Sequence, residues 1–216
     1  AIGFDGSTLK GRKMINIDSE EEGTLLSGCA GGLTADYCFE AEEFDTESVF
    51  LTVGINGLAG GHSGADIHKK RLNAIKALSF LCKEYIALGC RISEFNCGTK
   101  MNAIPFGGHI VLSVPDNKID TIKENAVSYL YNIKSLCVSP DDRPELEYRF
   151  SKKQKGKVLN EADSLKLCSF INELPDGIVS YTDETQRLVK TSLNLGVLEY
   201  KNGNFNATAL LRSSLN

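Results

Sequence analysis

The chain has 216 residues, of which 42% are hydrophobic and 24% are charged, a composition typical of a globular protein with one large domain or two small ones. The net charge of −4 argues against a nucleic-acid-binding surface, no apolar run approaches membrane-spanning length, and nothing at the beginning resembles a secretory signal. Seven cysteines without a Cys-x-x-Cys pair indicate reduced thiols in a cytoplasmic protein, rather than a disulfide framework or a zinc finger.

The two ends of the sequence read like interior segments of a longer chain. The sequence opens on Ala1 rather than on methionine, and residues 210–216 look like a strand that runs onward. We therefore expect a piece of a longer protein, which need not carry a complete active site.

Hydrophobic periodicity predicts the first elements. A short strand ends in Asp18, residues 24–42 are strand material broken by glycines, and residues 49–55 alternate as a strand. After a glycine-rich loop we expect a long amphipathic helix, capped at its N-terminus by Asp66 and closed by Gly89.

The same pattern continues with strands at residues 91–95 and 108–114. Asp116 is the expected cap of a second helix, and a strand at residues 145–150 follows it. The order strand, helix, strand, strand, helix, strand is that of a ferredoxin-like split βαβ fold.

The last third begins with a basic, glycine-containing link at residues 152–157, which we expect to be solvated. A third helix is predicted over residues 161–174, and Asn-Gly at 202–203 lies between two alternating runs, as in a β-hairpin. The predicted fold class is therefore α+β, a ferredoxin-like core with a largely antiparallel sheet and helices on one face, extended by a third helix and a C-terminal β-hairpin.

The glycine-rich segment 57–68 is the most informative part of the sequence. Glycines let the backbone approach a ligand closely, and His62 could donate a hydrogen bond there to a substrate oxygen or a developing oxyanion. The alternatives are a loop histidine held by neighbouring carbonyls, or a phosphate site at the helix start, although the spacing is not that of a P-loop or dinucleotide motif. Neither His68 nor His109 is assigned a functional role.

Three further residues are candidates with equally simple structural explanations. Asp18 follows a strand of buried type and suits a metal such as Zn²⁺ or Mn²⁺, but it could equally stabilise a turn. Asn102 could bind a ligand or its own turn. Arg212 could form a bidentate hydrogen-bonded pair with a carboxylate. Alternatively, its aliphatic stem could lie along a sheet edge with the guanidinium in solvent.

Several blocks of sequence, taken in order, resemble the aminoacyl-histidine dipeptidase family, also called peptidase D or Xaa-His dipeptidase. These blocks are residues 15–23, 28–32, 57–68, 102–105, 189–197 and 211–213. The family consists of co-catalytic metallopeptidases related to carboxypeptidase G, peptidase T and carnosinase, with a lid or dimerisation domain inserted into a catalytic domain. The resemblance implies residues 1–23 as a flank of the catalytic domain, 24–212 as the lid, and 213–216 as the start of the return.

The resemblance also implies roles for the candidate residues. Asp18 would be a zinc ligand, and His62 would polarise the scissile carbonyl in a neighbouring active site. Asn102 and Arg212 would hold the backbone and the terminal carboxylate of the dipeptide. It further implies two zinc ions, with Mn or Co as alternatives, and a homodimer formed through the lid.

Two departures from the family limit these expectations. Met101 stands where the family usually has arginine, and the remaining metal ligands and the general-base glutamate are missing from the chain. We therefore expect the chain alone to bind no metal and to hydrolyse no peptide. The alternatives are a non-catalytic ferredoxin-like binding or dimerisation module, and the lid of another hydrolase of the same clan, such as a carboxypeptidase or a deacetylase.

Overall fold

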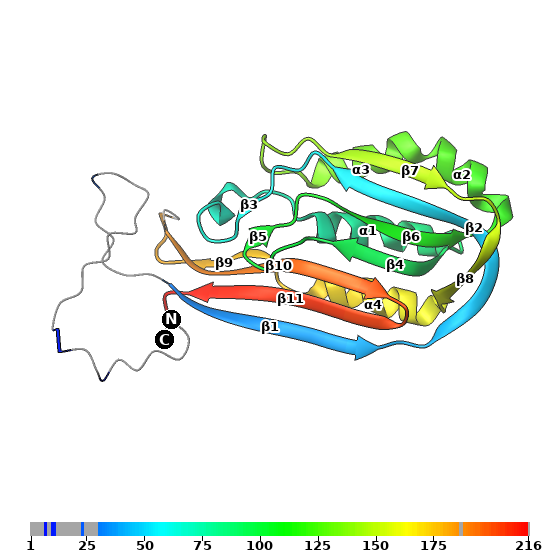
Figure 1. The fold of residues 1–216 in the computed structure, drawn as a ribbon. Helices are drawn as coiled ribbons and strands as arrows, with labels where there is room; N and C mark the ends of the chain where they lie inside the picture. Colours follow the sequence, from blue (N-terminus) through cyan, green and yellow to red (C-terminus); the bar gives the residue numbers. More distant parts are fainter. Residues whose placement is uncertain (1–6, 8–9, 12–22, 24–29, 186–187, 216) are drawn as a thin grey trace.

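The computed structural model of the chain describes residues 7, 10–11, 23, 30–185 and 188–215 (Figure 1). The strand predicted before Asp18, and Asp18 itself, lie outside the described residues.

The core of the fold is a four-stranded antiparallel sheet with strand order β4-β6-β2-β7. Its strands are β2 (Glu43–Asn56), β4 (Arg91–Cys97), β6 (Gly108–Val114) and β7 (Glu145–Phe150). Helix α1 (Ala74–Ala87) connects β2 to β4, and helices α2 (Ile119–Glu124) and α3 (Ala126–Leu136) connect β6 to β7. This order and connectivity confirm the predicted ferredoxin-like core.

The sheet continues beyond β4 with three long strands, in the order β10-β11-β1. They are β1 (Gly31–Glu40), β10 (Val189–Lys201) and β11 (Asn204–Ser213). Asn202 and Gly203 join β10 to β11 with φ values of 52° and 77°, the two positive values that a tight hairpin turn requires. The predicted C-terminal hairpin is therefore confirmed.

The helices lie on one face of the sheet, as predicted (Figure 1). Alternate residues of β2 point toward them, because successive side chains of a strand point to opposite faces. These residues and the facing side of α1 are fully buried and form the centre of the core: Leu51, Val53, Ile55, Ile75, Leu78 and Leu81. The third predicted helix is α4 (Glu161–Glu173), which packs against α1.

The first helix begins later than predicted, because Asn73 rather than Asp66 caps it. The Asn73 side chain accepts a hydrogen bond from the Ile75 N–H at 2.9 Å. Asp66 instead precedes a short 3₁₀ turn, η2 (Ile67–Lys69), and makes no capping hydrogen bond. Lys70, with φ 52°, lies between this turn and α1 and separates the two.

The second predicted helix is divided into three pieces. Asp116 lies inside a 3₁₀ turn, η3 (Asp116–Lys118), whose capping position is Pro115, so the predicted cap is wrong. Asn125 then separates α2 from α3, and its side chain donates to the Thr121 carbonyl at 2.8 Å. The Asn125 amide competes with the backbone for helical hydrogen-bond partners, which explains the interruption.

The link predicted at residues 152–157 is instead part of a strand, β8 (Gln154–Leu159), which pairs with the first half of β2. Its lysines hide the alternation, but Val158 and Leu159 are buried. Gly156 faces the ring of Phe50, which lies 2.5 Å from the Cβ that any other residue would carry. A second strand that the pattern did not predict, β9 (Gly177–Tyr181), pairs with β10. None of the described helices is long and apolar enough to cross a membrane.

Candidate functional site

His62 and Asn102 are brought together by a two-stranded sheet. Its strands are β3 (Gly61–His62) and β5 (Ala103–Ile104), and His62 pairs with Ala103. The next backbone bond runs from the Ser63 N–H to the Asn102 carbonyl, at 2.9 Å. Both His62 and Asn102 are exposed, so their side chains are accessible to a ligand.

Arg212 reaches the same place from the end of β11. A Cβ added to Gly64 would lie 3.2 Å from Cε1 of His62 and 3.3 Å from both Cζ and Nε of Arg212. The imidazole and the guanidinium therefore contact one small volume, which stays open because residue 64 has no side chain. In Figure 1, β3 and β5 lie at the end of the sheet where β11 ends and β1 begins.

The hydrogen bonds of the His62 ring determine where its proton lies. Nδ1 accepts from the backbone N–H groups of Gly64, at 3.2 Å, and Ala65, at 3.1 Å. In a neutral imidazole one nitrogen accepts and the other carries hydrogen. The hydrogen is thus on Nε2, which becomes a donor suited to an oxygen of a bound ligand.

Asp66 holds the main chain of His62 in position. Its Oδ2 accepts from the His62 N–H at 2.8 Å, and its own N–H donates to the His62 carbonyl at 2.9 Å. Lys69 forms an ion pair with Oδ1 at 2.8 Å. The hydrogen bond from Lys69, followed by the one from His62, lowers the pKa of Asp66 to about 2.

Arg71 supports the loop from beside Asp66, with which its Nη1 forms an ion pair at 3.8 Å. Its Nη1 donates to the Gly60 carbonyl at 2.7 Å, and its Nη2 pairs with Asp141 at 2.9 Å. The Arg71 side chain is only 14% exposed, whereas Asp141 is 51% exposed, so both bonds are charge-assisted but the second is partly solvated. Arg71 therefore joins the loop before His62 to the segment that precedes β7.

Asp142 makes a second connection between the same two segments. One of its carboxylate oxygens accepts from the Ala59 N–H at 3.0 Å, and the other accepts from the Leu72 N–H at 2.7 Å. Nearby, the Arg143 N–H donates to the Gly57 carbonyl at 2.9 Å, and a side chain at Gly57 would overlap the Arg143 carbonyl. Both arms of the loop are thus fastened to residues that precede β7.

Asn194, on β10, holds the segment around Asn102, which immediately precedes β5. Its amide donates to the carbonyls of Met101, at 3.0 Å, and Ala103, at 2.9 Å, and its side chain is almost fully buried. A Cβ at Gly196 would lie 2.6 Å from Cα of Met101, so the two backbones pack directly against each other. The backbone on both sides of Asn102 is therefore fixed by β10.

Three residues that hold the site, Asn194, Arg71 and Asp142, are not predicted from the sequence. Asn194 lies in a block that carries the family resemblance, where the pattern indicates only an alternating strand. Each of the three makes a hydrogen bond to a residue at least 70 positions away in the sequence. Arg71 also donates to the carbonyl of Gly60, which is near it in the sequence. No local pattern predicts such partners.

Three polar atoms in and beside the site are buried and lack a hydrogen-bond partner within the part of the chain that the structure describes. They are Oγ of Ser63, Nε of Arg71 and Nε of Arg212. An unpaired buried polar group costs about 1–3 kcal/mol, so a ligand oxygen that met any of these atoms would gain from it. Among the described residues, no three His, Cys, Asp or Glu side chains are grouped so that they could hold a metal ion.

We predict that the neutral His62 ring carries its hydrogen on Nε2. Long-range ¹H–¹⁵N NMR correlations of the imidazole distinguish the two tautomers directly. The expected result is one protonated Nε2 and one acceptor Nδ1 for His62, whereas the exposed His68 serves as a comparison. A predominant Nδ1–H form of His62 would contradict the hydrogen bonds described above.

We also predict a pH-dependent stability contribution from Asp66. Its folded-state pKa of about 2 is below the ordinary value of 3.8, so its contribution is complete above about pH 4 and disappears as the pH falls toward 2. Asp66→Asn should lower the free energy of unfolding by on the order of 1–2 kcal/mol at pH 6, after allowance for partial exposure.

Urea denaturation at several pH values between 3 and 7 measures this difference. It should shrink as the pH falls. Asp120→Asn, which removes the 88% exposed partner of Lys123, is the matched control and should have little effect at any pH. A difference between Asp66→Asn and the unsubstituted chain that does not change with pH would rule out the ionic role of Asp66.

Comparison with known proteins finds relatives of this chain, while no protein-family model matches it. The cytosol non-specific dipeptidase of Escherichia coli (strain K12) is 31% identical over 216 residues, which cover 99% of this chain and 44% of that protein. The crystal structure of aminoacylhistidine dipeptidase from Vibrio alginolyticus matches the fold of this chain with a TM-score of 0.82 and 30% sequence identity. The match covers 98% of this chain and 44% of that one.

The chain thus spans less than half the length of these relatives. The resemblance predicted from the sequence is confirmed: over nearly its whole length, the chain is similar in sequence and in fold to part of the aminoacyl-histidine dipeptidases.

Proposed function

We propose that this chain is the lid domain of a metal-dependent dipeptidase that hydrolyses Xaa-His dipeptides, and that it supplies residues that grip the substrate. The observation that carries this proposal is the gathering of His62, Asn102 and Arg212 at one end of the sheet, from three distant parts of the sequence. The similarity to two dipeptidases supports it independently.

The pairing of β1 with β11 supports the proposed domain boundaries. Gly31, at the start of β1, is the register partner of Ser213, at the end of β11. A domain inserted into another one needs its two ends close together, as they are here. We assign residues 24–212 to the lid, residues 1–23 to a flank of the catalytic domain, and residues 213–216 to the return.

His62 is proposed to act on the oxygen of the scissile carbonyl. Negative charge develops on that oxygen as the peptide bond is attacked, and a preorganised N–H donor stabilises it more than it stabilises the substrate. The bonds from Gly64 and Ala65 hold the ring so that Nε2 is the donor, and Asp66 holds the backbone. The proposed residue is therefore positioned before the substrate arrives.

Arg212 is proposed to bind the terminal carboxylate of the dipeptide, and Asn102 its backbone. A guanidinium matches a carboxylate geometrically, and the unpartnered Nε of Arg212 supports such a ligand. Holding both ends of a small substrate lowers the entropic part of the barrier. Next to Asn102, the side chain of Met101 is 46% exposed and presents an apolar surface where the family usually carries a charge.

We propose a metal site only for the longer protein that contains this chain. Zinc ions, with Asp18 as one ligand, would lower the pKa of the attacking water and bind the developing oxyanion. Among the described residues no cluster fits a metal, and the roles that we propose for this part of the chain are substrate binding, orientation and a hydrogen bond to the developing oxyanion. The E. coli relative is named a cytosolic dipeptidase, and we propose the cytoplasm as the location of this protein also.

We predict that the 216-residue chain alone does not hydrolyse Xaa-His dipeptides, with or without added Zn²⁺. In the longer protein that contains it, His62→Ala should lower kcat by about 10²- to 10³-fold, because a donor to the oxyanion is lost. Arg212→Lys should mainly raise KM, because lysine cannot make the bidentate hydrogen bonds that arginine makes with a carboxylate.

Ninhydrin or chromatographic detection of released histidine measures these rates. His109→Ala, on the strand β6, is the control and should retain normal kinetics. Unchanged kcat in the His62 variant would refute the proposed role of this residue. Hydrolysis by the purified chain alone would refute the assignment of the chain to the lid.

We further propose that the domain forms a homodimer through the edge of the sheet at β7 and through α3. β7 is the last strand on its side, and a strand edge offers unpaired backbone groups to another chain. On α3, Val127 and Tyr131 are one turn apart and are 81% and 73% exposed.

Sedimentation velocity over a wide concentration range tests this dimer. Tyr131→Glu should shift the population toward monomer by placing a charge in an apolar contact, whereas Val179→Asp, at an exposed position of β9, should not. A monomer at every concentration, or equal effects of both substitutions, would argue against the proposed surface.

A further inference from the structure

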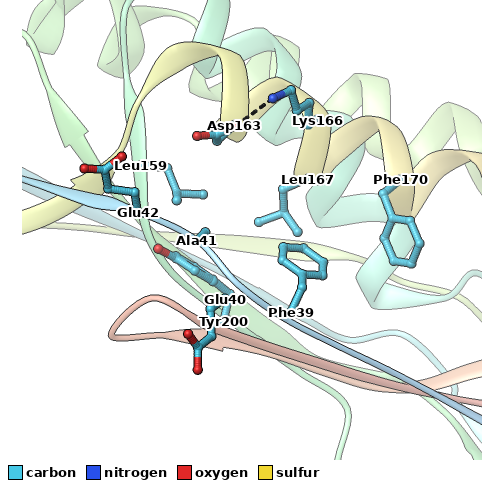
Figure 2. A pocket seen from close by; sticks show the side chains of 10 residues that line it. All are labelled: Phe39, Glu40, Ala41, Glu42, Leu159, Asp163, Lys166, Leu167, Phe170 and Tyr200. Atoms are coloured by element: carbon cyan, nitrogen blue, oxygen red, sulfur yellow. Dashed lines mark hydrogen bonds and ion pairs between the residues drawn. The ribbon is translucent and has the colours of Figure 1, made fainter.

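A cleft of about 410 Å³ lies between the end of β1 and helix α4, and the candidate site does not include it (Figure 2). In Figure 2, the ring of Phe39 and the side chain of Leu167 face each other across it, with Phe170 beside them. A volume of this size is within the range of about 300–1,000 Å³ that is usual for small-molecule sites.

The cleft lies at the opposite end of β1 from His62 and Arg212. Arg212 is the register partner of Gly32, near the start of the strand, and Phe39 follows Gly32 by seven positions. At about 3.3 Å per residue, the two places are on the order of 23 Å apart. A ligand in the cleft would therefore not contact the residues proposed to grip the dipeptide.

The floor of the cleft is apolar and closely packed. Phe39 stacks on Phe205 with ring centroids 4.3 Å apart, and Phe170 meets Phe205 edge-on at 5.7 Å. Leu159 and Leu167 are nearly fully buried beneath the opening, but Phe39 remains 43% exposed. An apolar ligand could cover that exposed ring without disturbing the packing below it.

The wall formed by residues 39–42 is held in place rather than loose. The Ala41 N–H donates to the Gly203 carbonyl at 2.7 Å, which attaches the wall to the turn between β10 and β11. The hydroxyl of Tyr200, at the base of the cleft, donates to Glu43 at 3.0 Å. A site that is formed in advance loses less ordering entropy when a ligand binds.

The charges around the opening favour a cation. The carboxylates of Glu42 and Asp163 line the cleft, against a single ammonium, from Lys166, whereas the side chain of Glu40 points to the opposite face of the sheet from Phe39 (Figure 2). Lys166 already donates to Asp163 at 3.0 Å, and this hydrogen bond lowers the pKa of the Asp163 carboxyl. Glu42 is exposed, so a bound ammonium could meet its carboxylate at the rim without losing its hydration.

From this combination, we propose that the cleft binds a small organic cation with an apolar body, such as an arylalkylammonium ion. The body lies against Phe39, Leu167 and Phe170, where the face of an aromatic ring also attracts a cation. The ammonium group lies at the rim near Glu42. Carboxylates at the mouth disfavour an anion of the same shape.

Titration of the ¹⁵N-labelled 216-residue chain with phenethylamine, followed by amide chemical shifts, tests the proposal. A ligand of this size is expected to bind with a Kd on the order of 1 mM. The shifts should map to residues 39–42 and 163–170. The neutral 2-phenylethanol should bind more weakly, and the anionic 3-phenylpropionate more weakly still.

Matched variants separate charge from shape. Glu42→Gln should weaken phenethylamine binding by about two- to fivefold, as expected for a partly exposed charge pair, whereas Glu40→Gln, on the opposite face of the sheet, should leave the Kd unchanged. Glu124→Gln, an exposed carboxylate on α2, should leave the Kd unchanged. Ala41→Leu should abolish binding by filling the cleft, and an unchanged amide spectrum elsewhere would show that the variant is folded.

Three results would overturn the proposal. They are no shift at the cleft in the presence of excess amine, equal binding of the anionic analogue, and binding that survives Ala41→Leu with the same shifts. None of these outcomes depends on peptidase activity, so this test and the test of the proposed function can fail separately.

Discussion

The attachment of one glycine-rich loop to distant parts of the chain is the constraint on which the candidate site depends. This loop, between β2 and α1, carries His62, and it is tied by Asp142 and Arg71 to the segment before β7. The strand β5 beside it is tied by Asn194 to β10. Glycines give the loop conformational freedom that is costly in entropy to fix, and these hydrogen bonds remove that freedom. Without them, the imidazole would not face Arg212.

Asp66 illustrates how such a loop selects between two local structures. An aspartate before an apolar run is a good helix cap, and the sequence favours that use. In the folded chain its carboxylate instead accepts the His62 N–H and pairs with Lys69, while Asn73 caps the helix. Both arrangements provide an acceptor for backbone N–H groups that would otherwise have no hydrogen-bond partner. The one that forms also fixes the backbone of His62, which the long-range contacts of Arg71 and Asp142 already hold nearby.

The two ends of the long strands have opposite electrostatic character. At the start of β1 and the end of β11, the accessible groups are an N–H of His62 and the guanidinium of Arg212, which suit oxygen atoms and carboxylates. At the other end, Glu42 and Asp163 line an apolar cleft and suit a cation. The sheet between them keeps the two places apart, because its strands are paired along their full length.

Periodicity and turn chemistry in the sequence were enough to determine the ferredoxin-like core, the third helix and the Asn-Gly hairpin, and several blocks of sequence in order carried the resemblance to a dipeptidase. They also singled out His62, Asn102 and Arg212, whose functional roles stay predictions, while Asp18 lies outside the described residues. Only the tertiary structure decided that α1 starts after Asn73, that the lysine-rich β8 joins β2, and that Asn194 and Asp142 hold the loops of the site. The reason is physical: helix and strand patterns depend on neighbours a few residues apart, whereas these hydrogen bonds join segments that meet only when the sheet has formed.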